Sequence, residues 1–227
     1  MKTFAEKIIQ FNRELSFRTK LPKGIGIMNP FQKNEEIIPI MESFYTKFYN
    51  DNSKRKLILG INPGRFGAGV TGIPFTDTKR LLELCDIKIE SISTHEPSSV
   101  FIYELIEHYG GTSAFFSNYY INSICPLGFI EQNKNGTWVN RNYYDYRILF
   151  ETMRPFIVSN LKKQIQFGID TTVCYILGKK NAKFFKLIND QEKLFDSIII
   201  FDHPRYIQQY KSKYKDEYLS CYLEKLI

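Results

Sequence analysis

The sequence predicts an α/β fold, a three-layer α/β/α arrangement with a central four-stranded parallel sheet. Short apolar runs bounded by turn residues indicate buried strands at 57–61, 119–125, 171–178 and 197–202. Helical patterns separate these runs, and such alternation is typical of a parallel sheet with helices on both faces. The chain has 227 residues and shows neither a linker nor an internal repeat, so we expect a single domain covering residues 1–227.

Helical patterns fill the segments between these strands. One of them contains Pro155, a residue able to disturb a helix. Residues 21–31 hold two prolines and two glycines, so we predict a loop there. Helices are expected at 3–17, 35–50, 98–109, 145–167, 179–188 and 214–226. A further helix is expected to start near Thr76 or Asp77, with Thr76 or Thr78 as its N-cap.

The composition indicates a folded protein with a basic surface. Hydrophobic residues make up 43% of the chain and aromatic residues 15%, enough for a core and for rings that stack on a ligand. The net charge of +7 favours a phosphate-bearing partner or an acidic membrane. No apolar stretch approaches the roughly 20 residues of a membrane span and no signal peptide is visible, so we expect a cytoplasmic protein without membrane contact. The four cysteines lie far apart, and we expect neither a disulfide framework nor a metal site.

Polar residues and glycine–proline turns follow the predicted strands. Parallel sheets bind their ligands at the carboxyl ends of the strands, where these residues would gather. Asn62 follows the first strand, and two interpretations are open. Its side-chain amide holds a water molecule or the edge of a substrate, or it is an ordinary residue of an Asn-Pro turn. His203 follows the last strand, where it meets a ligand or forms a satisfied turn histidine. The other histidines, His95 and His108, are expected at the surface.

Two further segments have a chemistry that fits nucleotides or nucleic acid. Residues 64–72 hold four glycines, which let the backbone approach a ligand closely, although neither the P-loop nor the Rossmann pattern is present. After the last strand, basic residues alternate with tyrosines. Such a segment binds nucleic acid through phosphate contacts and base stacking, or forms a solvated helix face. These residues are Arg205, Tyr206, Tyr210, Lys211, Lys213, Tyr214 and Lys215.

Several motifs resemble one known family. GINPGRFGAGVTGIPF at 60–75 is similar, without a gap, to the first motif of the single-strand-selective monofunctional uracil-DNA glycosylases, G-M-N-P-G-x-F-G-x-x-x-T-G-V-P-F. HPR at 203–205, with a glutamine and a lysine further on, resembles their second motif, HPSPRNPQANK, shortened by two residues. IMNP at 27–30 and CPL at 125–127 match family segments in the same order. The likeness extends over most of the chain and fits a divergent bacterial branch.

The resemblance implies an enzyme with a four-stranded parallel sheet that flips a damaged base out of DNA into a pocket at the strand ends. Asn62 would hold the attacking water, and His203 would hydrogen-bond the departing base at O2. Phe75 would stack on the flipped ring, and Gly64 would leave room beside C5. No metal or cofactor is implied. The residues implied at the base are Gly60, Ile61, Gly64, Phe66, Phe75, Asn122 and Ser123, and those implied at DNA are Arg65, Arg205, Tyr206, Gln208 and Lys211.

The chain departs from the family at two places. The family has an asparagine that reads the uracil edge two residues before the Cys-Pro-Leu segment, and this position holds Ser123. Asn122 is one residue earlier, and neighbours on a strand point to opposite faces, so it replaces that asparagine only if a bulge shifts the backbone. The segment after His203 also lacks the family's Ser-Pro, which changes the part expected to wedge into the duplex.

These departures leave three functions to weigh. The first is a monofunctional DNA glycosylase, expected to act as a monomer on damaged single- or double-stranded DNA. The second is a catalytically silent member of the same fold that binds DNA or damaged bases, an alternative that rests on Ser123. The third is a nucleotide-phosphate enzyme using the glycine-rich loop, which the missing phosphate-clamping lysine motif and acidic metal cluster disfavour. The preferred lesion, among uracil, hydroxymethyluracil, xanthine and hypoxanthine, is not determined by the sequence.

Overall fold

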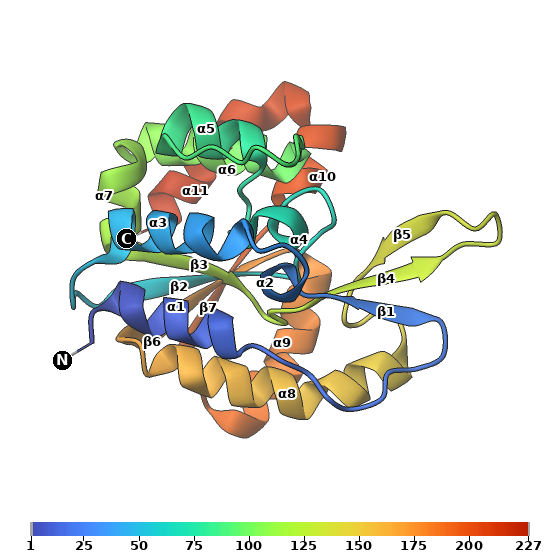
Figure 1. Ribbon diagram of the computed structural model, residues 1–227. Helices are drawn as coiled ribbons and strands as arrows, with labels where there is room; N and C mark the ends of the chain where they lie inside the picture. Colours follow the sequence, from blue (N-terminus) through green and yellow to red (C-terminus); the bar gives the residue numbers. More distant parts are fainter. Residues whose placement is uncertain (1, 227) are drawn as a thin grey trace.

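A four-stranded parallel sheet forms the centre of the computed structural model, which describes residues 2–226 (Figure 1). Its strands follow the order β3-β2-β6-β7, and each neighbouring pair is parallel. The strands are β2 (Arg55–Gly60), β3 (Tyr119–Ser123), β6 (Ile169–Leu177) and β7 (Ser197–Phe201). Each lies within two residues of a predicted strand, so the predicted parallel sheet is confirmed.

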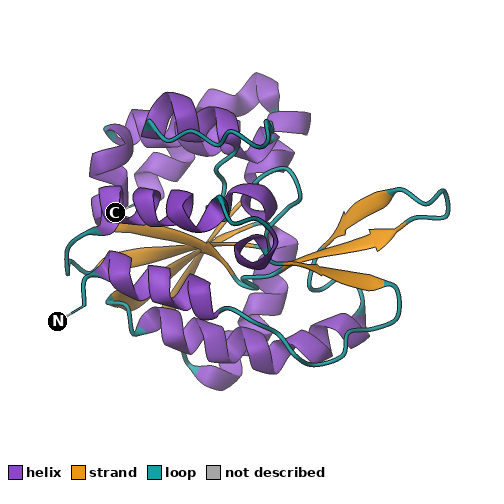
Figure 2. Ribbon diagram, viewed as in Figure 1, coloured by secondary structure: helices purple, strands orange, loops and turns teal. Residues whose placement is uncertain are grey.

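Helices cover both faces of this sheet, which gives the predicted three layers (Figures 1 and 2). One face is covered by α8 and α9, and the other by α6 and α7. The longer helices are α1 (Phe4–Glu14), α3 (Ile37–Tyr49), α5 (Thr78–Cys85), α6 (Pro97–Tyr109), α7 (Gly111–Asn118), α8 (Arg147–Ile165), α9 (Lys179–Glu192) and α11 (Lys215–Lys225). Shorter ones are α2 (Pro30–Lys33), α4 (Ala68–Thr71), α10 (Pro204–Tyr210) and the 3₁₀ turn η1 (Ser212–Tyr214). Within residues 2–226, none of the helices combines the length and apolarity that crossing a bilayer requires.

Local details of three predicted segments differ from the structure. The N-cap of α5 is Asp77, whose carboxylate accepts a hydrogen bond from the Arg80 amide at 2.9 Å, so neither Thr76 nor Thr78 caps this helix. Helix α8 continues through Pro155, because buried apolar residues before and after the proline anchor both halves. Residues 21–31, predicted as a loop, contain β1 (Ile25–Met28) and the start of α2.

A second, antiparallel sheet of three strands was not predicted from the sequence. It joins β1 to β4 (Gly128–Gln132) and β5 (Trp138–Arg141), in the order β1-β4-β5. The hairpin of β4 and β5 projects from the body of the molecule (Figure 2). Its strands are short and partly exposed, so they lack the apolar run that marks the strands of the central sheet. The chain segment that follows β5 reaches the carboxyl edge of the central sheet, where it meets Asn62.

Most aromatic side chains pack against one another in the core. Phe4, Tyr49 and Tyr120, for example, come from three elements and have ring centroids 5.5–5.9 Å apart. These contacts account for much of the aromatic content noted in the sequence. The aromatic side chains that stay exposed are Phe66, Trp138, Tyr146, Tyr206, Tyr210 and Tyr214. Three of these six belong to the basic segment after β7, where an aromatic surface had been considered.

Candidate active site

A cavity of about 340 Å³ opens at the carboxyl edge of the central sheet. The residues that follow β2 and β7 and the last residue of β3 all contribute to its wall, as the fold rule for parallel sheets predicts. The wall consists of Ile61, Asn62, Pro63, Gly64, Ala68, Pro74, Phe75, Glu96, Ser98, Ser123, Asn140, Asn142, His203, Arg205, Tyr206, Gln209 and Tyr210.

Asn62 is held in one orientation by the end of β5 and the segment that follows it. Its Oδ1 accepts a hydrogen bond from the Tyr143 amide at 3.0 Å, and its Nδ2 donates to the Arg141 carbonyl at 3.1 Å and to the Pro63 carbonyl at 3.4 Å. A carboxamide oxygen accepts two hydrogen bonds, whereas both amide hydrogens here have partners. One lone pair of Oδ1 therefore remains for a donor in the cavity, such as a water molecule.

His203 presents a neutral ring to the same cavity. It is the N-cap of α10, and its Nδ1 accepts a hydrogen bond from the Arg205 amide at 3.2 Å. In a neutral imidazole one nitrogen accepts and the other donates, so the proton sits on Nε2. Desolvation of the ring, and next the charge of Arg205, lower the pKa of His203 to about 4. At neutral pH the side chain is thus an uncharged donor, like an amide N–H.

Phe75 forms an aromatic wall of the cavity beside His203. The two rings are 6.0 Å apart and tilted by 45°. Phe75 has a positive φ of 54°, and its carbonyl accepts a hydrogen bond from the Ser99 hydroxyl at 2.7 Å, which fixes this unusual backbone. A β-carbon on Gly60 would lie 2.6 Å from the ring, so glycine at the end of β2 is what lets the ring lie there. Gly60 therefore shapes the cavity from behind rather than lining it.

The structure places Ser123 and Asn122 on opposite faces of β3. Ser123 lines the cavity, whereas the Asn122 Nδ2 donates to the Tyr120 hydroxyl and to Gln164 Oε1, both at 2.7 Å, inside the protein. The pairing of β2 with β3 runs without a bulge through these positions. The expectation that Asn122 contacts the base is therefore wrong for this structure, and only Ser123 among the two can reach a ligand.

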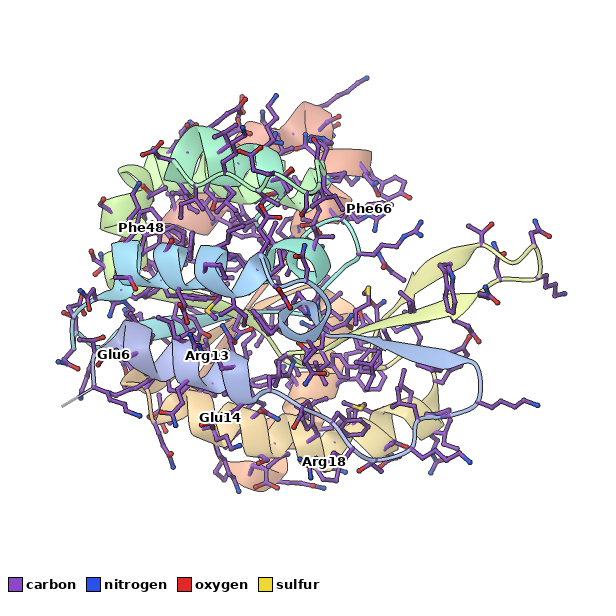
Figure 3. The ribbon with its side chains drawn as sticks, viewed as in Figure 1. Glu6, Arg13, Glu14, Arg18, Phe48 and Phe66 are labelled. Carbon is purple, nitrogen blue, oxygen red and sulfur yellow. The ribbon has the colours of Figure 1, made fainter. Side chains whose placement is uncertain are left out.

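Ile61 and Gly64 line the cavity as expected, but Phe66 does not. Phe66 lies on the loop after β2 (Figure 3), with half of its surface exposed. The guanidinium of Arg65 is 4.6 Å from its ring centroid. A β-carbon on Gly64 would be in ordinary van der Waals contact with Asn140 Nδ2 at 3.6 Å and Glu96 Oε1 at 3.8 Å, so the glycine leaves the space of a side chain to the cavity.

Helix α10 borders the mouth of the cavity with cationic and aromatic side chains. Arg205 and Tyr206 line the cavity, and Tyr206 stacks at an angle on the exposed Tyr210, with centroids 5.8 Å apart. Gln208 differs from expectation: it is partly buried on the inner side of α10, with a buried Oε1, and Gln209 takes its place at the cavity. Lys211, also expected at DNA, lies past the end of the helix with its ammonium 6.0 Å from the Tyr214 ring.

Besides Gln209, sequence reasoning missed four polar residues of the wall: Glu96, Ser98, Asn140 and Asn142. Asn140 and Asn142 come from β5 and the segment after it, and Asn140 Oδ1 accepts a hydrogen bond from the Arg65 amide at 3.2 Å. Glu96 and Ser98 come from the start of α6. Burial, and next the charge of Asp77, raise the pKa of the Glu96 carboxyl to about 7. The only sequence signal was the Glu-Pro-Ser start of a helix, which predicts a cap rather than a cavity wall.

The fold and the cavity together define an α/β protein built to hold a flat polar aromatic group. An aromatic wall, an oriented carboxamide and a neutral histidine donor suit a nucleobase, and the cationic aromatic helix beside them suits a polynucleotide. None of the described residues form a cluster of histidine, cysteine and acidic side chains of the kind that holds a metal ion.

Comparisons with known proteins place the chain in a family. The model of the uracil DNA glycosylase superfamily matches residues 46–227. The crystal structure of wild-type SMUG2 from Pedobacter heparinus is similar over 99% of this chain and 97% of that chain, with 51% sequence identity and a TM-score of 0.96. A search of curated protein sequences gives no match. The chain belongs to the uracil-DNA glycosylase superfamily and to its SMUG-like members, as its motifs had predicted.

Proposed function

We propose that the protein is a monofunctional DNA repair glycosylase. It flips uracil or a related deaminated or oxidised base out of DNA and hydrolyses the N-glycosidic bond. The observation that carries this proposal is the pair of Asn62 and His203 at the cavity. Their hydrogen bonds leave the Asn62 Oδ1 as an acceptor and the His203 Nε2–H as a donor. We further infer that the protein acts as a monomer in the cytoplasm and needs no cofactor.

Asn62 has the chemistry to place the nucleophile. Breaking the bond leaves an oxocarbenium-like sugar, which a weakly activated water can attack. The free lone pair of Asn62 Oδ1 accepts a hydrogen from this water and thereby turns a water lone pair toward the sugar. A carboxamide is too weak a base to remove the proton fully, so positioning is its main contribution. The bonds from Tyr143 and to Arg141 hold the carboxamide in this orientation.

His203 has the chemistry to stabilise the departing base. As the bond breaks, negative charge grows on the base, and for a pyrimidine much of it falls on O2. The Nε2–H of neutral His203 donates to this oxygen from a ring held in place by its own hydrogen bond, and a preorganised donor of this kind needs no reorganisation as the charge develops. Since the pKa of His203 is about 4, the ring keeps this donor role over the whole neutral range. A protonated ring would be a stronger proton donor, but this role requires only the neutral ring.

The remaining walls set which bases fit. Phe75 would stack on the flipped ring, and Ile61 lines the cavity beside it. Ser123 occupies the position at which the family has the asparagine that reads uracil. A hydroxyl donates or accepts, and it is shorter than a carboxamide, so it discriminates less sharply between bases. We therefore expect a broader range of lesions than an asparagine in this place would allow.

DNA would reach the cavity across α10. Arg205 offers a phosphate contact at the mouth, and Tyr206 and Tyr210 offer ring faces that can occupy the gap left by the flipped base. Arg65 and Lys211 are proposed as further phosphate contacts.

One assay separates this function from a catalytically silent, damage-binding protein, the alternative that Ser123 raises. The protein is incubated with end-labelled single-stranded DNA carrying one uracil, and half of each sample is treated with alkali. We expect strand scission only after alkali, because a monofunctional glycosylase leaves an intact abasic site. Binding without scission would support the silent protein, and scission without alkali would contradict the monofunctional reaction.

A further inference from the structure

The carboxyl group of Glu96 is the one acidic group among the residues that line the cavity. Glu96 is the N-cap of α6, yet its side chain makes no capping hydrogen bond and turns toward the cavity. Its Oε2 is buried and has no hydrogen-bond partner. Gly67 lies against this oxygen so closely that a β-carbon there would collide with it. The protein thus encloses a carboxyl group without offering donors to it, which favours the uncharged acid.

Taken together, the charges around Glu96 also favour its uncharged form. Asp77 is buried and its carboxylate accepts a hydrogen bond from the Glu96 amide at 2.8 Å, so its negative charge opposes ionisation of Glu96. Arg80 forms a salt bridge with Asp77 at 3.1 Å and partly offsets its charge, and the His95 ring lies 3.7 Å from the same carboxylate. Arg205 favours ionisation, but burial and Asp77 outweigh it, and the pKa of Glu96 rises to about 7. His203, in the same cavity, is neutral.

Glu96 lies next to Gly64, since a β-carbon on Gly64 would be 3.8 Å from Glu96 Oε1. The resemblance to the glycosylase motif places C5 of a flipped pyrimidine beside Gly64. If a purine nucleotide binds with its sugar in the same place, the purine N7 lies on the side where a pyrimidine has C5. N7 is a ring nitrogen with a free lone pair and accepts a hydrogen bond. A pyrimidine offers no acceptor on its ring here, so a neutral carboxyl at this place is suited to purines.

A purine also has the greater need of a proton donor at this site. Uracil leaves as an anion whose O2 meets His203. Hypoxanthine has no O2, and its N3 takes the equivalent position, so His203 can donate to N3 but not to the imidazole half of the purine that carries N9 and N7. The charge that grows on this half is neutralised by a proton on N7.

We propose that Glu96 is the general acid that protonates N7 of a flipped 6-oxopurine while its glycosidic bond breaks, an inference that rests on the proposed glycosylase function. The electron pair of the C1′–N9 bond passes to the purine, which accepts the Glu96 proton at N7 and leaves as a neutral base. Water adds to C1′ and releases one proton to solvent. The Glu96 carboxylate then regains a proton from solvent, so atoms and charge balance.

The test compares single-turnover excision of uracil, hypoxanthine and 7-deazahypoxanthine from otherwise identical oligonucleotides between pH 5.5 and 9. Wild-type protein and Glu96→Gln are compared, because glutamine keeps the size of the side chain but holds no acidic proton. Glu107→Gln is the matched control, since Glu107 is an exposed carboxyl on the same helix. Thermal unfolding of each variant shows that it is folded.

Four results are expected. Wild-type excision of hypoxanthine falls about tenfold per pH unit above pH 7, because the acid form of Glu96 disappears. Glu96→Gln lowers hypoxanthine excision by about 10²–10⁴-fold, the usual contribution of a general acid, and removes this pH dependence. Its loss on uracil is at least about tenfold smaller. With 7-deazahypoxanthine, which lacks N7, the wild type and Glu96→Gln are equally slow.

Other outcomes would overturn the proposal in distinguishable ways. Equal losses on uracil and hypoxanthine in Glu96→Gln would show a structural or water-binding role for Glu96. Excision of uracil but not hypoxanthine by the wild-type protein would refute the purine step and leave the proposed function intact. Excision of no base at all would refute the proposed function itself.

Discussion

Replacement of His203 should remove most of the chemical step without much effect on DNA affinity. The Nδ1 of this residue is occupied by the Arg205 amide, so Nε2–H is the donor left for the base. Loss of one preorganised donor to a developing anion costs about 3–4 kcal/mol, or about 10²–10³ in rate. This energy appears only as the bond breaks, so binding of intact DNA should change little.

The choice of variant matters because His203 also caps α10. Alanine would lose the cap as well as the donor, at a cost of about 1 kcal/mol in stability. Asparagine is a good N-cap and is too short to reach the base, so His203→Asn isolates the donor. We expect both variants to lose similar activity, with the asparagine variant unfolding at the higher temperature.

Single-turnover rates on uracil and on 5-fluorouracil test the role directly. The 5-fluorouracil anion leaves more easily and needs less help, so the defect of His203→Asn should be smaller on this substrate. For the wild-type protein, uracil excision should not change between about pH 5 and 7 on account of His203, since its pKa is about 4. An equal fold-loss on the two substrates would refute the assignment and make His203 structural.

Three further changes have definite expected outcomes. Arg205→Gln should weaken binding of non-cleavable damaged duplex and lower the log–log salt slope by about 0.9, as one phosphate contact does; an unchanged slope would place this side chain away from DNA. Gly67→Ala should displace the carboxyl of Glu96 and reduce hypoxanthine excision more than uracil excision, and equal rates for wild type and variant would show that the carboxyl is not confined there. Folding stability should also depend on Glu96: because its folded pKa is raised from 4.5 to about 7, its contribution is fully present below pH 4.5 and is lost as the pH rises through 7, by about 3 kcal/mol in all. Urea unfolding at pH 5 and pH 8 should therefore show a smaller pH effect in Glu96→Gln, and an identical effect would contradict the raised pKa.

The sequence was sufficient for the central sheet and for the position of Asn62 and His203 at its carboxyl edge. Buried parallel strands are continuous apolar runs, and the fold rule then brings the residues after β2 and β7, Asn62 and His203, to one edge. The alternation of side chains along a strand also predicts that Asn122 and Ser123 point to opposite faces, as they do in the structure. These are properties of one element at a time, and the chain displays them locally.

The parts that were missed depend on contacts between distant segments. The strands of the β4–β5 hairpin are short and half exposed, so no apolar pattern marks them, yet the segment after β5 orients Asn62 through Tyr143. Glu96 looks like a residue at a helix start, and its place in the cavity wall follows from packing of α6 against the loop that contains Gly67. The N-cap of α5 was misplaced by one residue because Asp77 and its neighbouring threonines are all good caps.

The most direct test of the account is base release by Asn62→Ala. Uracil excision from single-stranded DNA is measured under single-turnover conditions for the wild type and the variant, with DNA binding and thermal unfolding measured alongside, since the change also removes the hydrogen bonds to the Arg141–Tyr143 segment. We predict that the folded variant still binds DNA and loses about 100-fold or more of the excision rate, because the attacking water is no longer held. An excision rate equal to that of the wild type would contradict the account.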